Sequence, residues 1–270
     1  MGDNLAAVTA SESDLLARLV AEARADMERR RALTTTEDHE RAIHDYTPKD
    51  FVGALRGPGL AVIAEMKQRT PSMGVLTEEY RPTDLARAYS DGGAAAISVL
   101  THMAGFGGRP EHLAVARIAT DLPILRKDFI TDPYEIGEAR AAGADAVLLI
   151  VAALPGAALQ RLLAVVRSRG LSALVEVHTF DEAKAAVDAG APVIGVNHRD
   201  LRTFEVDLGL TEKLRPAIPD SVLMVSESGI RTVGDARRMR EAGADAVLVG
   251  EMLMRAADPV ACLRELASVK

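Results

Sequence analysis

The sequence has few aromatic residues, no long apolar run and one cysteine, and each of these features disfavours a class of protein. Of its 270 residues, none is Trp, four are Tyr and five are Phe. This is too few aromatic side chains for a surface that stacks single-stranded nucleic acid, and the net charge of -7 also disfavours that partner. No apolar run approaches the roughly 18 residues of a membrane-spanning helix. We therefore expect neither a nucleic acid nor a membrane as a partner.

Cysteine is also scarce, since Cys262 is the only one. One cysteine cannot form an intrachain disulfide, which fits a reducing compartment. The first 14 residues are acidic and lack the apolar core of an export signal. These features predict a cytoplasmic location.

Short apolar segments, each followed by helix-forming sequence, repeat along most of the chain. The candidate strands are 61–67, 94–100, 123–129, 145–151, 172–178, 192–197, 222–227 and 245–250. The phrases AGADAVLLIV and AGADAVLVG repeat one helix-to-strand junction, with glycine at the helix end. Nearly continuous apolar strands indicate a parallel sheet buried on both faces. Eight such units predict an α/β fold, a single (β/α)8 TIM barrel with an N-terminal helical extension.

The extension is residues 1–55, whose pattern differs from the repeat. Apolar residues at helical spacing predict a helix from Ser11 to about Ala32, with Ser11 and Asp14 as a capping box. Residues 34–55 are polar and mixed, and 56–59 form a turn signal. We predict a boundary at residue 55, with the catalytic barrel domain over 56–270.

Charged and polar side chains stand at the C-terminal ends of five predicted strands. They are Glu65, Lys67, Lys127, Glu176, Asn197 and Glu227. Residues two apart in a strand face the same way, and the C-terminal ends of the strands form the active site in barrels of this kind. Two lysines, three glutamates and an asparagine therefore predict a catalytic bowl.

The last two strands carry a second signal. Ser228-Gly229 follows the seventh strand, and Gly250-Glu251 closes the eighth. Glycine lets backbone N–H groups approach an anion, and the loops at these two positions often bind phosphate. We predict a phosphate site there.

Three histidines and one motif point elsewhere. His102, His178 and His198 follow strand ends and could together ligate a metal, but we expect them beyond the bowl and predict no metal. The motif His198-Arg199-Asp200-Leu201 also begins a kinase catalytic loop, but Glu205 stands where that loop needs a magnesium-binding Asn. We interpret it as a coincidence.

Seven motifs, in order, resemble those of the indole-3-glycerol-phosphate synthase family. They are AEMKQRTPSMG, AISVLT, LRKDFI, LVEVH, GVNHRDL, SESGI and LVGEMLM. The resemblance covers essentially the whole chain. It implies an anionic sugar-phosphate substrate, 1-(2-carboxyphenylamino)-1-deoxyribulose 5-phosphate. The family closes its pyrrole ring, releases carbon dioxide and water, and leaves indole-3-glycerol phosphate for tryptophan biosynthesis.

The resemblance also implies roles for the residues of the bowl. Lys127 would be the general acid, and Glu176 a second acid/base group that acts in the dehydration. Lys67 would hold the anionic substrate, with Glu65 orienting the lysines and Asn197 and Glu227 lining the bowl. The remaining substrate contacts would be Ser228, Gly229, Gly250 and the Glu251 amide at the phosphate, Phe106 and Phe129 at the anthranilate ring, and Ser72 in a mobile flap. The N-terminal extension would help to cover the bowl.

The chemistry itself suggests that no cofactor is needed. Ring closure places the carboxylate on a tetrahedral carbon conjugated to an iminium, which accepts the electrons of decarboxylation. Protonation of the ketone needs a donor near neutral pH. Crowding by Lys67 would lower the pKa of Lys127, whereas Glu65 and Glu227 would oppose that shift, so the sequence leaves its direction open.

Departures from the family pattern leave two alternatives. The loop 102–109 is Gly-rich and ends in Arg109 where Ser is usual, and His198 stands where Asn is common. The chain could therefore be a paralogue that acts on a substituted anthranilate adduct. It could also be a catalytically silent phosphate-binding barrel that serves as a partner subunit, although the intact bowl argues against this. We expect a monomer or a weak homo-oligomer.

Overall fold

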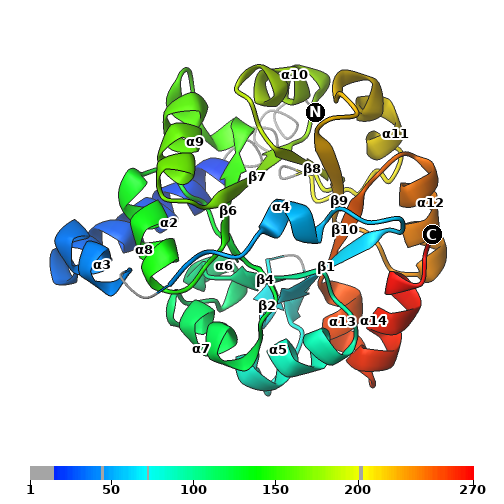
Figure 1. Cartoon of the computed structure of the whole chain (residues 1–270), viewed down its shortest axis with the longest axis horizontal. Helices are drawn as coiled ribbons and strands as arrows, with labels where there is room; N and C mark the ends of the chain where they lie inside the picture. Colours follow the sequence, from blue (N-terminus) through cyan, green and yellow to red (C-terminus); the bar gives the residue numbers. More distant parts are fainter. Residues whose placement is uncertain (1–14, 44–45, 72, 201–202) are drawn as a thin grey trace, which may run out of the picture.

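The computed structural model describes residues 15–43, 46–71, 73–200 and 203–270. Eight parallel strands close into a barrel, each hydrogen-bonded to the next and the last to the first (Figure 1). They are β1 (Ala61–Met66), β4 (Ala96–Leu100), β5 (Ile124–Lys127), β6 (Ala146–Ile150), β7 (Ser172–Val177), β8 (Val193–Asn197), β9 (Leu223–Glu227) and β10 (Ala246–Val249). Each lies within one of the eight predicted segments, so the predicted TIM barrel is confirmed.

Helices that follow the strands surround the barrel (Figure 1). They are α5 (Pro82–Asp91), α6 (Met103–Phe106), α7 (Glu111–Ala119), α8 (Pro133–Ala141), α9 (Ala158–Ser168), α10 (Phe180–Asp188), α11 (Leu210–Leu214), α12 (Val233–Glu241), α13 (Glu251–Arg255) and α14 (Pro259–Ala267). Short elements complete the fold: β2 (Arg69–Thr70), β3 (Gly74–Val75), η1 (Val151–Ala153) and η2 (Arg215–Ala217). Within the described ranges, none of the helices combines the length and apolarity that crossing a membrane demands.

The repeated junction has a physical reason that the structure shows twice. Asp145 accepts a hydrogen bond from the Ile124 backbone N–H at 2.6 Å, and Asp245 accepts one from the Met224 N–H at 2.8 Å. Each aspartate thus ties the start of its own strand to the start of the preceding one. Gly143, two residues before Asp145, ends its helix with a φ of 86°, a conformation that favours glycine.

The alternation of side chains along the strands explains why the barrel interior is apolar and its C-terminal end is charged. Leu125, Leu174 and Val225 belong to one buried hydrophobic cluster inside the barrel. Two residues further along the same strands, and therefore on the same face, stand Lys127, Glu176 and Glu227. The interior face of each of these three strands thus ends in a charged side chain at the C-terminal end of the barrel.

Among the described residues, three helices precede β1: α2 (Leu15–Leu33), α3 (Thr36–Ala42) and α4 (Phe51–Ala54). The predicted N-terminal helix is confirmed over the described residues, whereas its expected start at Ser11 and Asp14 lies outside them. Leu19 of α2 and Phe51 of α4 both belong to the cluster inside the barrel, and α4 lies across the centre of the ring of strands in Figure 1. The division into residues 1–55 and 56–270 stays a prediction.

Candidate active site

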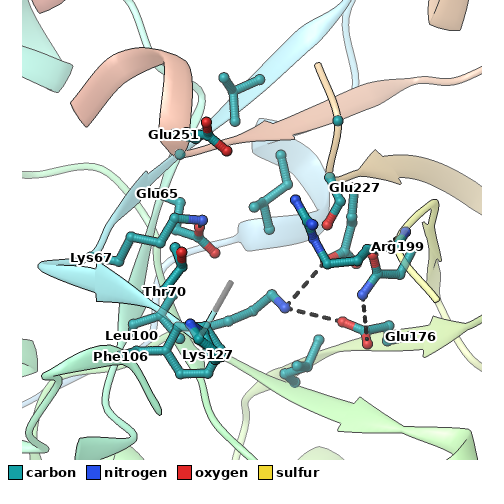
Figure 2. Close-up of a pocket in the computed structure, with 18 of the residues that line it drawn as sticks. Glu65, Lys67, Thr70, Leu100, Phe106, Lys127, Glu176, Arg199, Glu227 and Glu251 are labelled. Atoms are coloured by element: carbon teal, nitrogen blue, oxygen red, sulfur yellow. Dashed lines mark hydrogen bonds and ion pairs between the residues drawn. The ribbon is translucent and has the colours of Figure 1, made fainter. Parts of the chain in front are cut away.

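One cavity at the C-terminal end of the barrel gathers the predicted site residues. It is lined by Glu65, Lys67, Phe106, Lys127, Phe129, Glu176, Asn197, Glu227, Ser228, Gly229, Gly250 and Glu251. Figure 2 shows the side chains of Lys127, Glu176 and Glu227 converging from separate strands. Ser72 lies outside the described residues, although its neighbours Thr70 and Pro71 also line the cavity.

Lys127 lies at the centre of an ion-pair network (Figure 2). Its Nζ donates a hydrogen bond to Glu176 Oε2 at 3.0 Å and lies 3.4 Å from Glu227 Oε2. Asn197 Nδ2 donates to the other oxygen of Glu176 at 3.1 Å. Burial lowers the pKa of Lys127, but the charges of Glu176 and Glu227 outweigh it and raise the pKa above its usual value. The protonated form of Lys127 is therefore favoured.

Lys67 has its own partner, because its ammonium forms a salt bridge with Glu65. Gly250, which follows β10 and precedes α13, packs directly against this pair. A Cβ at position 250 would lie 2.9 Å from Lys67 Nζ and 3.0 Å from Lys67 Cε, closer than carbon atoms normally approach. Only glycine fits here without displacing the salt bridge.

Glu227 and Glu176 are both buried, but their pKa values shift in opposite directions. Burial, reinforced by the charges of Glu176 and Glu65, raises the pKa of Glu227 to about 7 against the pull of Lys127. For Glu176, burial also acts to raise the pKa, but Lys127, His178 and Asn197 outweigh it and lower the pKa. Two carboxyl groups with separated pKa values can act as an acid and a base in one site.

The backbone at the predicted phosphate site is unusual. Ser228 and Gly229 have φ values of 68° and 79°, and such a conformation is costly for serine. His198 stabilises it, since its Nδ1 donates to the Ser228 carbonyl at 2.9 Å while its Nε2 accepts from Thr211 Oγ1 at 2.7 Å. We assign this tautomer because the carbonyl can only accept. Burial lowers the pKa of His198, which favours the neutral ring that this network requires.

Arg199 and Arg231 also line the cavity and were not among the predicted site residues. The Arg199 backbone N–H donates to Asn197 Oδ1 at 3.1 Å, and Figure 2 shows its side chain beside the carboxylates. The signal for Arg199 was present, because it stands two positions after Asn197 and continues its face. Both cations lie in the same cavity as Ser228 and Gly250, so the cavity holds cationic side chains as well as backbone donors.

None of the three histidines lines the cavity, as expected, but each contacts a residue that does. The His102 ring lies 5.1 Å from that of Phe129, edge to face. His178 Nε2 lies 3.6 Å from Glu176 Oε1, and His198 holds Ser228 as described above. The sequence interpretation that set them apart from the site therefore missed three supporting contacts.

A buried ionic network connects α2 to the strand that carries Lys127. Arg126 is fully buried and donates to Glu138 at 2.7 Å and to Asp128 at 3.0 Å. Arg30 of α2 donates to the other oxygen of Glu138 at 2.6 Å. Leu15 and Leu19 of the same helix line the cavity. The network thus fixes α2 beside the aromatic end of the site, and no sequence pattern indicated it.

The closed barrel and the ion-paired lysines and glutamates at its C-terminal end define a (β/α)8-barrel enzyme of the acid–base type. A family model described as indole-3-glycerol phosphate synthase matches residues 16–266. The chain therefore belongs to the indole-3-glycerol phosphate synthase family.

Individual relatives agree with this family. The chain is 60% identical over 248 residues to indole-3-glycerol phosphate synthase 2 of Streptomyces coelicolor, covering 92% of this chain and 96% of that one. It is 48% identical over 259 residues to the indole-3-glycerol phosphate synthase of Mycobacterium sp. strain KMS, covering 96% and 95%. Among solved structures, thiamine phosphate pyrophosphorylase from Pyrococcus furiosus matches with a TM-score of 0.59 and 21% identity over 77% of this chain and 93% of that one. That last likeness supports the fold alone.

Proposed function

We propose that the chain converts 1-(2-carboxyphenylamino)-1-deoxyribulose 5-phosphate to indole-3-glycerol phosphate in tryptophan biosynthesis, and that Lys127 is its general acid. The observation that carries this role is the placement of Lys127 Nζ between Glu176 and Glu227, at 3.0 and 3.4 Å. Both carboxylates hold the ammonium in the cavity and keep it protonated. A protonated lysine there can donate to the substrate ketone when the anthranilate carbon attacks it.

Glu176 is the base of this proposal. Lys127 and Asn197 donate to its carboxylate, His178 lies 3.6 Å away, and its lowered pKa favours the ionised form. In the dehydration it takes the proton from the carbon beside the ring nitrogen while Lys127 protonates the departing oxygen. Asn197 and Glu65 act through their neighbours, since Asn197 bonds Glu176 and Glu65 bonds Lys67.

The cavity offers a place for each end of the substrate. We propose that Ser228, Gly229, Gly250 and the Glu251 amide bind the phosphate, helped by Arg199 and Arg231, and that Lys67 meets the substrate carboxylate. Phe106 and Phe129 lie with their ring centroids 6.5 Å apart and would wall the anthranilate ring. Ser72, the cytoplasmic location and the monomeric or weakly oligomeric state stay predictions from the sequence.

The absence of tryptophan allows a direct test. The substrate is added to the protein, and the fluorescence of the indole product is followed against almost no protein background. Lys127→Ala should fold normally and lose at least 99% of the rate, since a general acid is worth roughly 10²–10⁴-fold. A variant that keeps more than about a tenth of the native rate contradicts the role of Lys127.

The same assay separates the alternatives. No indole fluorescence at high protein concentration would identify a catalytically silent barrel. Faster turnover of a ring-substituted substrate than of the unsubstituted one would identify a paralogue. We expect the unsubstituted substrate to be preferred.

A further inference from the structure

The proposed reaction consumes a proton that the substrate does not contain. The substrate carboxylate leaves as neutral carbon dioxide, and the ketone oxygen leaves as water with two protons. One of these comes from the carbon beside the nitrogen, which loses a hydrogen when the pyrrole ring becomes aromatic. The second must come from solvent in every turnover. Lys127 and Glu176 have side chains only 14% and 2% exposed, and bound substrate fills the cavity above them, so this proton needs a route.

A row of three titratable groups, Glu176, His178 and Glu182, extends away from Lys127. Glu176 Oε2 accepts from Lys127, whereas Glu176 Oε1 lies 3.6 Å from His178 Nε2. His178 Nδ1 lies 3.5 Å from Glu182 Oε2, which also accepts the His178 backbone N–H at 2.7 Å. Within the described residues, His178 Nε2 is buried and has no hydrogen-bond partner. The imidazole is thus fixed at its outer edge, and its inner edge faces the catalytic carboxylate.

His178, the middle residue of this row, also lines a second cavity. It has a volume of about 550 Å³ and is lined by His178, Asn197, His198, Asp200, Thr203, Glu205, Val206, Asp207 and Leu210. Asn197 lines both this cavity and the catalytic one. His178 therefore stands between the buried carboxylate and a second, polar cavity that has room for water.

We propose that His178 is a proton-relay residue that delivers the solvent proton of each turnover from this second cavity to Glu176. The His178 imidazolium gives its Nε2 proton to Glu176 Oε1. Glu176 turns about its Cγ–Cδ bond and passes the proton to Lys127, which has given a proton to the substrate oxygen and is a neutral amine. This leaves His178 neutral, with its remaining proton on Nδ1. The ring turns about its Cβ–Cγ bond, the freed Nε2 takes a proton from water in the second cavity that His178 lines, and the restored imidazolium turns back. Lys127 supplies both protons of the departing water, one regained from the substrate C–H through Glu176 and one from solvent.

The electrostatics around His178 suit a donor. Burial lowers its pKa, but the hydrogen bond to Glu182 and the charge of Glu176 outweigh it, so the pKa lies above the usual value. Glu227 acts in the same direction. The other titratable groups that face it are Lys127 beyond Glu176 and the four in the second cavity, His198, Asp200, Glu205 and Asp207. The acidic residues among them favour a protonated ring.

The relay rests on the proposed function, and single-turnover fluorescence separates the two. His178→Gln keeps the size and polarity of the side chain but cannot titrate. We expect its single-turnover rate to fall about tenfold with an unchanged KM, less than the roughly 10²–10⁴-fold of a group that touches substrate. Lys184→Gln, on the exposed face of α10, is the matched control and should keep the native rate. If the native protein forms no product, the proposed function fails; if His178→Gln matches the native rate at every pH, only the relay fails.

Two further readings distinguish a relay from a structural role. The native rate should fall as pH rises and His178 loses its proton, and this limb should be absent in His178→Gln. Glu182→Gln should move the limb to lower pH by about one unit, because it removes an opposite charge beside the imidazole; it leaves Glu227 untouched. In His178→Gly, added imidazole should restore the rate in proportion to its protonated fraction. A limb that stays in place in Glu182→Gln, or a rate that imidazole does not restore, would overturn the relay.

Discussion

Gly195 should be indispensable because of one neighbour, Glu227. Gly195 lies on the inner face of β8, and a Cβ there would overlap Glu227 Oε1 and stand 3.1 Å from Glu227 Cδ. On its other side, Leu174 Cδ1 would be 3.2 Å away. Carbon atoms prefer about 3.5–4.0 Å, so the methyl group of Gly195→Ala cannot retreat and the carboxyl must move.

The expected cost follows from these distances. Overpacking by one carbon in a filled interior costs about 1–3 kcal/mol. Against this, replacing glycine by alanine at an ordinary backbone conformation stabilises by about 0.4–1 kcal/mol through the unfolded chain. The φ of Gly195 is not in the positive range, so this gain applies. We expect Gly195→Ala to lower the free energy of unfolding by about 1–2 kcal/mol, the difference of the two effects.

A double-mutant cycle with Glu227→Ala tests the cause. The free energy of unfolding is measured by urea denaturation for the native protein, the two single variants and the double variant. In the Glu227→Ala background the carboxyl is gone, so Gly195→Ala should become neutral or stabilising. An equal loss of unfolding free energy in both backgrounds would assign the clash to Leu174 and refute the reasoning. A Gly195→Ala variant as stable as the native protein would also refute it.

Three further outcomes follow from the site. Arg30→Met should raise KM about tenfold, equivalent to about 1.4 kcal/mol, with little change in kcat, because the helix that lines the cavity loses its ion pair. Arg18→Met, at an exposed position on the same helix, should change neither constant. A fall in kcat alone would contradict this. Folding raises the pKa of Glu227 from 4.5 to about 7, so its contribution to stability is full below pH 4.5 and is lost by about 3 kcal/mol as pH rises through 7. Between pH 5 and pH 8 the free energy of unfolding should therefore fall by about 3 kcal/mol more in the native protein than in Glu227→Gln. Equal pH dependence in the two proteins would exclude the raised pKa of Glu227. His198→Ala should weaken binding of inorganic phosphate, measured by calorimetry, because Ser228 loses the partner of its carbonyl; unchanged affinity would remove His198 from the phosphate site.

Periodicity was enough to predict the barrel and most of the cavity. The eight strands were found because apolar runs of four to six residues recur with helix signals between them. The charged residues at the strand ends were predicted because a lysine or glutamate that ends such a run on the interior face points into the cavity. The short helices α3 and α4 were not predicted, since four to seven residues carry too few turns for a helical period.

Contacts across the chain could not be predicted in the same way. Arg126 is buried in β5, and its partner Glu138 stands 12 positions further along the chain; Arg30, which donates to the same carboxylate, stands 108 positions before Glu138. Nothing in the local pattern pairs them. The support that His198 gives Ser228 similarly spans 30 positions. Such pairs depend on which loops the closed barrel brings together, and this is a property of the three-dimensional structure.

The pKa of Lys127 shows the same limit and its chemical consequence. The sequence allowed two opposite shifts, because it placed a second lysine and several glutamates nearby without distances. The structure separates the lysines into two ion pairs, Lys67 with Glu65 and Lys127 with Glu176 and Glu227. With Glu227 ionised these five groups carry a charge of -1, which opposes an anionic substrate, and with Glu227 protonated they carry none. The raised pKa of Glu227 therefore lets the site accept a carboxylate while Lys127 keeps the proton that it has to donate.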